Sequence, residues 1–173
     1  MPRLARRIDF RDDDVVILTM KSQDTHEALH ALRDAGARNQ AIVCGQNGVA
    51  NERAALRLFA NVYGMTVVSP GTYLTPGEVL CHAKPKRGLF DLGRLPPPAS
   101  TTRPAPIAAH LDGAEFKTFL FEDVMRSKYG KLLENQTNIV KAALGNRAVT
   151  EFDGLLKAEG QAAYRAAGSS GSR

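Results

Sequence analysis

Three apolar runs, separated by helical patterns, dominate the first part of the chain. Val15–Met20 and Ala41–Cys44 are nearly continuous apolar runs, and Val62–Val68 is a third. Runs without polar alternation are typical of strands buried on both faces, as in a parallel sheet covered by helices. Between the runs, residues 25–35 and 51–59 place apolar side chains at helical spacing. Strand, helix, strand, helix, strand is the repeating unit of an α/β sheet.

After the third run the pattern changes to short strands and turns. Residues 79–82 and 89–92 are strand candidates, and we expect them to form an antiparallel addition. Five of the nine prolines fall between residues 96 and 106, which is typical of a loop. A short helix at 107–111 and a last strand at 117–121 are expected to follow.

The longest helical pattern covers residues 123–144, and Gly145 is expected to end it. Its predicted apolar stripe consists of Val124, Tyr129, Leu132, Leu133, Ile139 and Val140. Residues 153–167 form a second helix candidate, and the final residues SSGSR are expected to be a flexible tail.

Composition narrows the class of protein. The chain has 173 residues, 43% of them hydrophobic, and no apolar run approaches the ~18 residues of a membrane span. Only two cysteines are present, which argues against a disulfide scaffold and favours the cytoplasm. The net charge of +5 comes from scattered basic residues without interleaved aromatics, so we expect a small anionic molecule rather than nucleic acid as partner.

Polar turns follow the first two predicted strands. Lys21–Thr25 follows the first, and Gly45–Gly48 follows the second. Because the carboxyl ends of parallel strands meet at one edge of a sheet, these turns are expected to lie together. That edge is where open α/β sheets bind ligands.

Several segments, taken in order, resemble the ketopantoate reductase (2-dehydropantoate 2-reductase) family. The segments are VVILTMKSQDT, IVCGQNGVANE and MRSKYGKLLEN, with TYLTPGEV and PKRGLFDLG between the last two. The resemblance covers residues 13 to 167. It implies an enzyme that reduces 2-dehydropantoate to pantoate with NADPH, on the route to pantothenate and coenzyme A.

The same resemblance implies two domains. Residues 1–121 are expected to form a partial Rossmann-like domain, and residues 122–173 the beginning of a helical C-terminal domain. Family members begin with a strand that carries a G-x-G-x-x-G/A turn, and this sequence has no such motif. The chain is therefore expected to be truncated at both ends, with a free sheet edge and a tendency to self-associate. A non-catalytic remnant, or a fragment that needs a partner chain, is the alternative function.

The resemblance assigns the candidate residues of the last long helix. Lys131 matches the family's catalytic lysine, which would supply a proton to the developing alkoxide. Asn135 lies four residues on, on the same helical face, and would bind substrate. The position where the family usually has another Asn is Ile139. Without the resemblance, Lys131 and Asn135 are an ordinary solvated lysine and a surface amide.

Two further candidates lie in the turns after the strands. By resemblance, Asn47 would approach both nicotinamide and substrate, and Lys21 would contact the cofactor. Their plain alternatives are an Asn-Gly turn and a charge at a strand end. His26 and His30 have metal-compatible spacing, but no third ligand accompanies them, so we expect a solvated helix face and no metal site.

Overall fold

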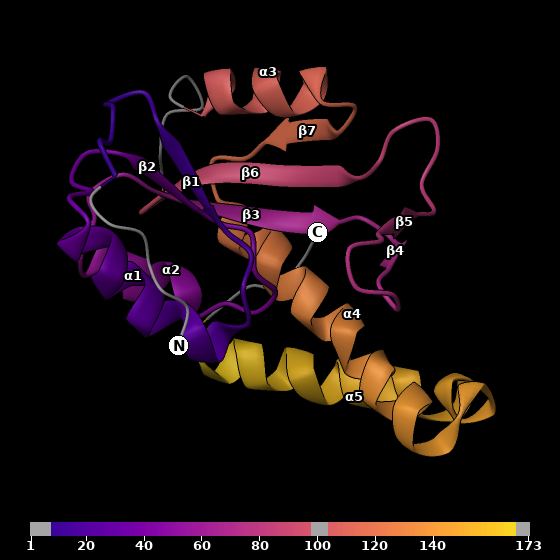
Figure 1. Ribbon diagram of the computed structural model, residues 1–173. Helices are drawn as coiled ribbons and strands as arrows, with labels where there is room; N and C mark the ends of the chain where they lie inside the picture. Colours follow the sequence, from indigo (N-terminus) through magenta and orange to yellow (C-terminus); the bar gives the residue numbers. More distant parts are fainter. Residues whose placement is uncertain (1–7, 98–103, 169–173) are drawn as a thin grey trace. The chain divides into compact units, whose positions relative to one another are not determined.

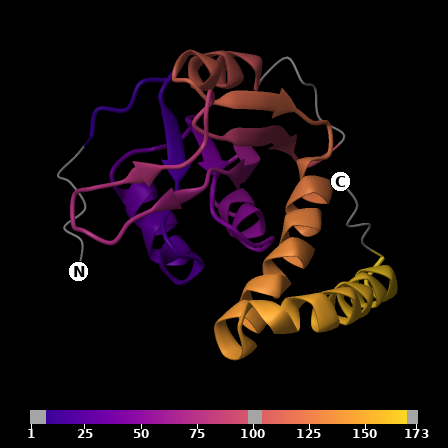
Figure 2. The ribbon, with the colours of Figure 1, turned by 90° about the vertical axis from the view of Figure 1, so that its right-hand side faces the viewer.

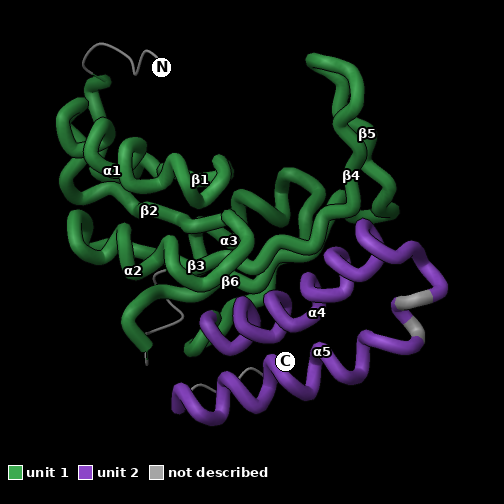
Figure 3. The backbone as a smooth tube through the Cα atoms, turned by 90° about the horizontal axis from the view of Figure 1, so that it is seen from below, with its two compact units in different colours: residues 1–124 green, residues 125–173 purple. Residues whose placement is uncertain are grey.

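The computed structural model describes residues 8–97 and 104–168. The chain forms two compact units, Met1–Val124 and Met125–Arg173, shown in different colours in Figure 3. Each unit is described by itself. In the described part of the chain, no helix is both long and apolar enough to cross a membrane.

The first unit is built on a five-stranded mixed sheet with the strand order β1-β2-β3-β6-β7 (Figure 1). Its strands are β1 (Val15–Leu18), β2 (Ala41–Cys44), β3 (Val62–Val68), β6 (Leu89–Leu95) and β7 (Lys117–Leu120). The first three strands are parallel, as predicted. Strand β6 returns antiparallel to β3, and β7 lies parallel to β6.

Helices cover the two faces of this sheet (Figure 1). They are the 3-10 turn η1 (Ser22–Asp24), α1 (Thr25–Asp34), α2 (Asn51–Leu56) and α3 (Ala105–Gly113). Helices α1 and α2 pack on one face and α3 on the other. The chain leaves α1 through Gly36, whose φ of +108° lies in the region that favours glycine.

Strand β2 is buried on both faces, because successive side chains of a strand point to opposite sides. Ile42 and Cys44 join the cluster beneath α1 and α2, together with Leu29. Val43 points the other way and packs with Tyr63 near α3. The predicted two-sided burial is confirmed for this strand, and Cys44 is a buried apolar residue in it.

Strand β1 does not have this two-sided burial, and for it the prediction was wrong. Leu18 is buried, but Val15 and Ile17 are 41% and 39% exposed. The reason is position, since β1 is the edge strand of the sheet. The strand also ends at Leu18 rather than at Met20.

The antiparallel addition was predicted in outline, with different bounds. Strand β6 continues to Leu95 beside β3. Residues Leu80–Cys81 form β5, which pairs with β4 (Gly71–Thr72) in a separate two-stranded sheet rather than with the main one. Residues 98–103 of the proline-rich segment lie outside the described residues.

Two of the predicted helices have different bounds. Helix α2 ends at Leu56, before the predicted end at residue 59. Helix α3 begins at Ala105, before the predicted start at residue 107, with the buried Pro104 at its N-cap. The last strand, β7, ends at Leu120, close to the prediction.

The second unit is formed by two long helices. Helix α4 (Val124–Leu144) starts at the last residue of the first unit, and α5 (Asn146–Ala166) follows after Gly145, whose φ is +81°. Figure 2 shows the turn between them. The end of α4 at Gly145 was predicted, but α5 begins well before residue 153. The tail 169–173 lies outside the described residues.

Close contacts join α4 to α5. A Cβ built at Gly160 would lie 2.6 Å from Leu133 Cδ2, so the helices are in close contact there. The Tyr164 hydroxyl donates to the Tyr129 carbonyl at 3.3 Å. Burial of Tyr164, followed by the nearby Tyr129, raises the pKa of the Tyr164 hydroxyl. Ile139, predicted to lie in the apolar stripe, is instead 72% exposed.

A polar contact also joins the two helices. Thr137 Oγ1 donates to Asp153, which forms an ion pair with Lys157 one turn further along α5, at 2.7 Å. The hydrogen bond from Lys157, followed by that from Thr137, lowers the pKa of the Asp153 carboxyl.

Candidate functional site

The carboxyl ends of β1 and β2 bring two of the candidate residues to one edge of the sheet. Leu18 and Cys44, the last residues of the two strands, are directly paired. Lys21 and Asn47 each lie three positions beyond their strand end, and both side chains are exposed. The edge therefore presents an ammonium group and an amide to solvent at the place where open α/β sheets bind ligands.

A network of uncharged side chains anchors the turn that carries Asn47. Asn51 Nδ2 donates to the Asn47 carbonyl at 3.3 Å and to Ser22 Oγ at 3.1 Å. Thr25 Oγ1 donates to Asn51 Oδ1 at 3.1 Å, and Gln46 Nε2 donates to Thr25 Oγ1 at 2.8 Å. The network thus ties the start of α1 and the turn after β1 to the turn after β2.

Three of the four anchoring side chains are buried, whereas Ser22 and the Asn47 side chain are exposed. Thr25, Gln46 and Asn51 are each no more than 6% exposed. A hydrogen bond between such groups contributes about 1 kcal/mol, and leaving one partner unsatisfied costs more. Gly48, at φ +90°, completes the turn in a conformation that favours glycine. The backbone at Asn47 is held in place while its amide side chain remains accessible.

No local pattern in the sequence indicates this network. Ser22, Thr25 and Gln46 lie in the predicted turns, and Asn51 lies at the start of a predicted helix. One signal was available: Asn51 lies four residues before Ala55, so it shares the inward face of α2. Glu52 beside it is fully buried in the first turn of α2.

The other two candidates lie on α4, in the second unit. Lys131 and Asn135 are one helical turn apart, and both are half-buried. Their spacing places the ammonium group and the amide on one face of the helix. Ile139, one further turn along the same face, is exposed. An ammonium group and an amide on one face of a helix can both form hydrogen bonds with a polar, oxygen-containing molecule.

Other residues of interest have structural explanations. The rings of His26 and His30 contact each other on the exposed face of α1, with centroids 4.4 Å apart. Among the described residues, no group of three or more side chains is placed to hold a metal ion. Arg87, in the basic cluster 84–87, forms an exposed ion pair with Glu115 at 2.6 Å.

The fold and this edge define a class of protein. Parallel strands whose carboxyl ends meet at one edge, followed by long helices, form a Rossmann-like domain and the start of an all-helical domain. Residues 5–97 match the family described as ketopantoate reductase PanE/ApbA. The chain belongs to this family.

Solved structures have the same fold. A PanE/ApbA family ketopantoate reductase from Ralstonia eutropha JMP134 is 25% identical, with a TM-score of 0.73 over 90% of this chain and 53% of that one. A 2-dehydropantoate 2-reductase from Geobacter metallireducens GS-15 is 22% identical, with a TM-score of 0.68 over 86% of this chain and 53% of that one. A D-mandelate dehydrogenase in complex with NADH is 15% identical. Its TM-score is 0.78, over 91% of this chain and 55% of that one. The chain spans about half the length of these structures.

Proposed function

We propose that the chain carries out the NADPH-dependent reduction of 2-dehydropantoate, or of a related 2-keto acid, to the 2-hydroxy acid. The reaction would belong to pantothenate and coenzyme A biosynthesis in the cytoplasm. The observation that carries the proposal is the pairing of family membership with a rigidly anchored Asn47 at the carboxyl edge of the sheet. The choice of NADPH and of this substrate rests on the family.

The described residues fit the nicotinamide end of such a cofactor. Asn47 offers an amide that can hydrogen-bond a carboxamide, and the ammonium group of Lys21 can pair with a phosphate. The sequence contains no glycine-rich G-x-G-x-x-G turn. We therefore assign no residue other than Lys21 to the phosphates. When bound, NADPH supplies the hydride that reduces the substrate carbonyl carbon.

Lys131 and Asn135 would act on the substrate. As the carbonyl carbon gains the hydride, negative charge develops on the carbonyl oxygen. In the proposal, Lys131 donates a proton to that oxygen, so the ketone becomes a hydroxyl group and the lysine becomes neutral until it is reprotonated from solvent. Asn135, one turn away, holds the substrate by hydrogen bonds.

The experiment is NADPH oxidation by the purified chain in the presence of 2-dehydropantoate. Lys131→Ala is expected to lower kcat by roughly a hundredfold or more, because it removes the proton donor. Lys141→Ala, on the same helix and exposed, is the matched control and is expected to leave the rate unchanged. Substrate-dependent turnover that survives in Lys131→Ala would overturn the assignment of the acid.

The cofactor is tested in the same assay. NADH is the alternative cofactor to compare, because the D-mandelate dehydrogenase structure with the same fold contains it. The proposal expects a higher kcat/KM with NADPH than with NADH. Asn47→Ala is expected to lower kcat/KM, whereas Asn138→Ala, an exposed amide on α4, is expected to leave it unchanged.

A non-catalytic chain, or one that acts only with a partner chain, is the second candidate. The exposed apolar side chains of β1, Val15 and Ile17, favour it, because a partner chain could cover them. A folded chain with a cooperative unfolding transition but no turnover with either cofactor would support this candidate over the first.

A further inference from the structure

Helix α1 carries two histidines one turn apart. His26 and His30 lie at positions i and i+4, which face the same side of a helix. Both side chains are exposed, and their ring centroids are 4.4 Å apart. Within residues 8–97 and 104–168, neither ring takes part in a hydrogen bond or an ion pair. The two imidazoles are therefore accessible from solvent as a pair.

The separation of the rings fits two imidazoles on one metal ion. An imidazole nitrogen binds such an ion at about 2.0–2.1 Å, which places the ring centroid about 3.2 Å from the metal. Two rings at a right angle around the ion then have centroids about 4.5 Å apart, and two rings at the tetrahedral angle about 5.2 Å apart. The observed 4.4 Å matches the right angle.

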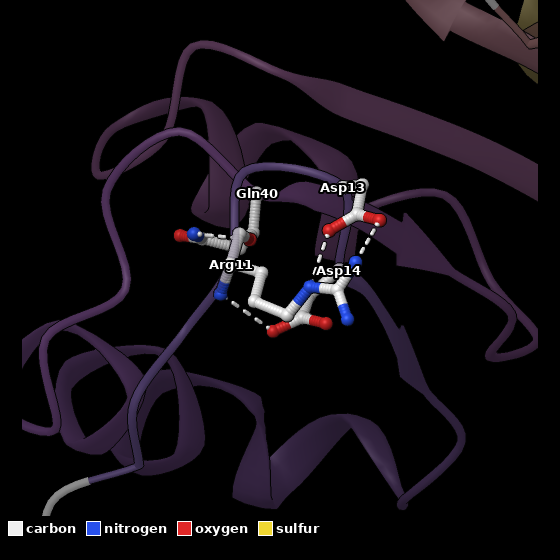
Figure 4. A network of polar contacts seen from close by, with 4 residues as sticks. All are labelled: Arg11, Asp13, Asp14 and Gln40. Carbon is white, nitrogen blue, oxygen red and sulfur yellow. Dashed lines mark hydrogen bonds and ion pairs between the residues drawn. The ribbon is translucent and has the colours of Figure 1, made fainter.

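Hydrogen bonds hold the helix at both ends. At its start, Thr25 Oγ1 donates to Asn51 Oδ1 at 3.1 Å. Beyond its end, Arg38 N donates to Gln40 Oε1 at 2.7 Å, and Gln40 Nε2 donates to the Arg11 carbonyl at 2.9 Å (Figure 4). A fixed backbone favours chelation, because only the side chains must be ordered when an ion binds.

The charges of α1 favour a cation beside the pair. Arg33 is the one Lys or Arg of the helix, and its guanidinium is engaged elsewhere. It donates to the Leu58 carbonyl at 2.6 Å and lies over the Phe59 ring, 5.8 Å from the centroid. Glu27 and Asp34 are exposed acidic residues of the same helix. An approaching cation therefore meets carboxylates rather than a guanidinium.

We propose that His26 and His30 bind a divalent transition-metal ion that prefers right-angled coordination, Ni²⁺ or Cu²⁺, with water in the remaining positions. The sequence from His26 to His30 has the H-E-x-x-H order of zinc-binding helices in metalloproteases. A catalytic zinc site needs three protein ligands, and the described residues contain no such group. The lack of a third ligand thus excludes a closed or hydrolytic site, but not two imidazoles completed by water.

The acidic segment before β1 is the competing place for a cation (Figure 4). Arg11 already pairs with Asp13 at 2.7 Å, and its backbone N–H donates to Asp14 Oδ2 at 2.8 Å. Carboxylates suit hard ions such as Mg²⁺ and Ca²⁺, whereas imidazoles suit Ni²⁺ and Cu²⁺. The choice of ion therefore separates the two places.

The test is calorimetric titration of the full chain with Ni²⁺ at neutral pH. Ni²⁺ is the probe because, unlike Cu²⁺, it is not reduced by an exposed thiol such as that of Cys81. One ion per chain is expected. His26→Ala and His30→Ala are each expected to raise the dissociation constant at least tenfold, because each removes one of the two protein ligands. His110→Ala, which removes an exposed histidine of α3, is the matched control and is expected to leave the constant unchanged.

A second variant tests the spacing. Glu27→His combined with His30→Ala keeps the number of histidines but separates the two by about 100° around the helix, so it is expected to bind no better than His30→Ala. Thermal unfolding supplies an independent readout. Ni²⁺ is expected to raise the midpoint of the unsubstituted chain but not that of His30→Ala, because the unfolded chain does not hold the imidazoles together.

Three results would overturn the proposal. They are no binding, binding that survives in both His26→Ala and His30→Ala, and an equal loss in His110→Ala, which would mean an adventitious ion only. Zn²⁺ bound more tightly than Ni²⁺ would overturn the right-angled geometry. None of these outcomes depends on whether the chain is a reductase.

Discussion

Strands β1 and β2 have similar sequences but different surroundings. Both are short and almost wholly apolar, and they pair residue for residue from Val15 with Ala41 to Leu18 with Cys44. In β2, Ile42, Val43 and Cys44 are all 0% exposed. In β1, every second side chain is exposed. An apolar run therefore reports that a segment is a strand, but not whether both of its neighbours are present.

The largest expected difference between the two strands comes from a buried charge. Val43→Asp places a carboxylate in the buried cluster on the α3 side of the sheet and is expected to lower the free energy of unfolding by roughly 4 kcal/mol or more. Ile17→Asp, at the exposed edge, is expected to lower it by less than about 1 kcal/mol. Urea unfolding at a concentration where the chain is monomeric measures both. Equal losses would mean that β1 is covered as β2 is.

The sheet has no room for an added side chain at Gly93 of β6, and a substitution there tests how tightly it is packed. A Cβ there would collide with the Phe121 carbonyl and lie 2.8 Å from Val124 Cβ. Gly93→Ala is therefore expected to lower the free energy of unfolding by about 2 kcal/mol. Gly113→Ala has nothing within 4 Å and is expected to stay within about 0.5 kcal/mol of the unsubstituted chain. A tolerated Gly93→Ala would show that β6 can shift.

At the carboxyl end of β1, hydrogen bonds rather than core contacts position the chain. Asn51→Ala is expected to cost about 1–2 kcal/mol, because it removes the donor to the Asn47 carbonyl and to Ser22. Hydrogen exchange at the amides of residues 46–48 should accelerate beyond the global change. Exchange that rises equally throughout the sheet would argue against local anchoring. Asn61→Ala, whose amide bonds the exposed Asn39 carbonyl, serves as the control.

The smallest expected difference compares two losses. One is the loss of a single methylene group in the core, and the other is the loss of two methyl groups at the sheet edge. Ile42→Val is expected to lower the free energy of unfolding by about 1 kcal/mol. Val15→Ala removes more atoms, yet is expected to change it by no more than about 0.5 kcal/mol. The midpoints of thermal unfolding should rank the two variants in that order. The reverse order would place Val15 in the core.

The repeating part of the fold was predictable because it depends on local pattern. Strands β2 and β3 and helix α4 lie close to where apolar spacing predicts them. The exposed side of β1 was not predictable, since it depends on what stands beside the strand. Strand β5 has only two residues, and hydrogen bonds to β4 rather than an apolar pattern define it.

The site was predictable to a smaller extent. The register of β1 and β2 brings the turns with Lys21 and Asn47 to one edge, as strand order implied. The network that anchors the turn was not visible, because its hydrogen bonds join residues as far apart as Ser22 and Asn51. The roles of Lys131 and Asn135 came from resemblance alone, since no spacing rule separates them from ordinary helix residues.

The anchoring network has a consequence for measurements made as a function of pH. The network consists of hydroxyl and amide side chains, which do not ionise at ordinary pH. They belong to Ser22, Thr25, Gln46 and Asn51. The turn that carries Asn47 is therefore expected to keep its shape over the whole range in which the chain stays folded. A pH dependence of ligand binding at this edge would therefore report a change in the ligand rather than a loosening of the scaffold.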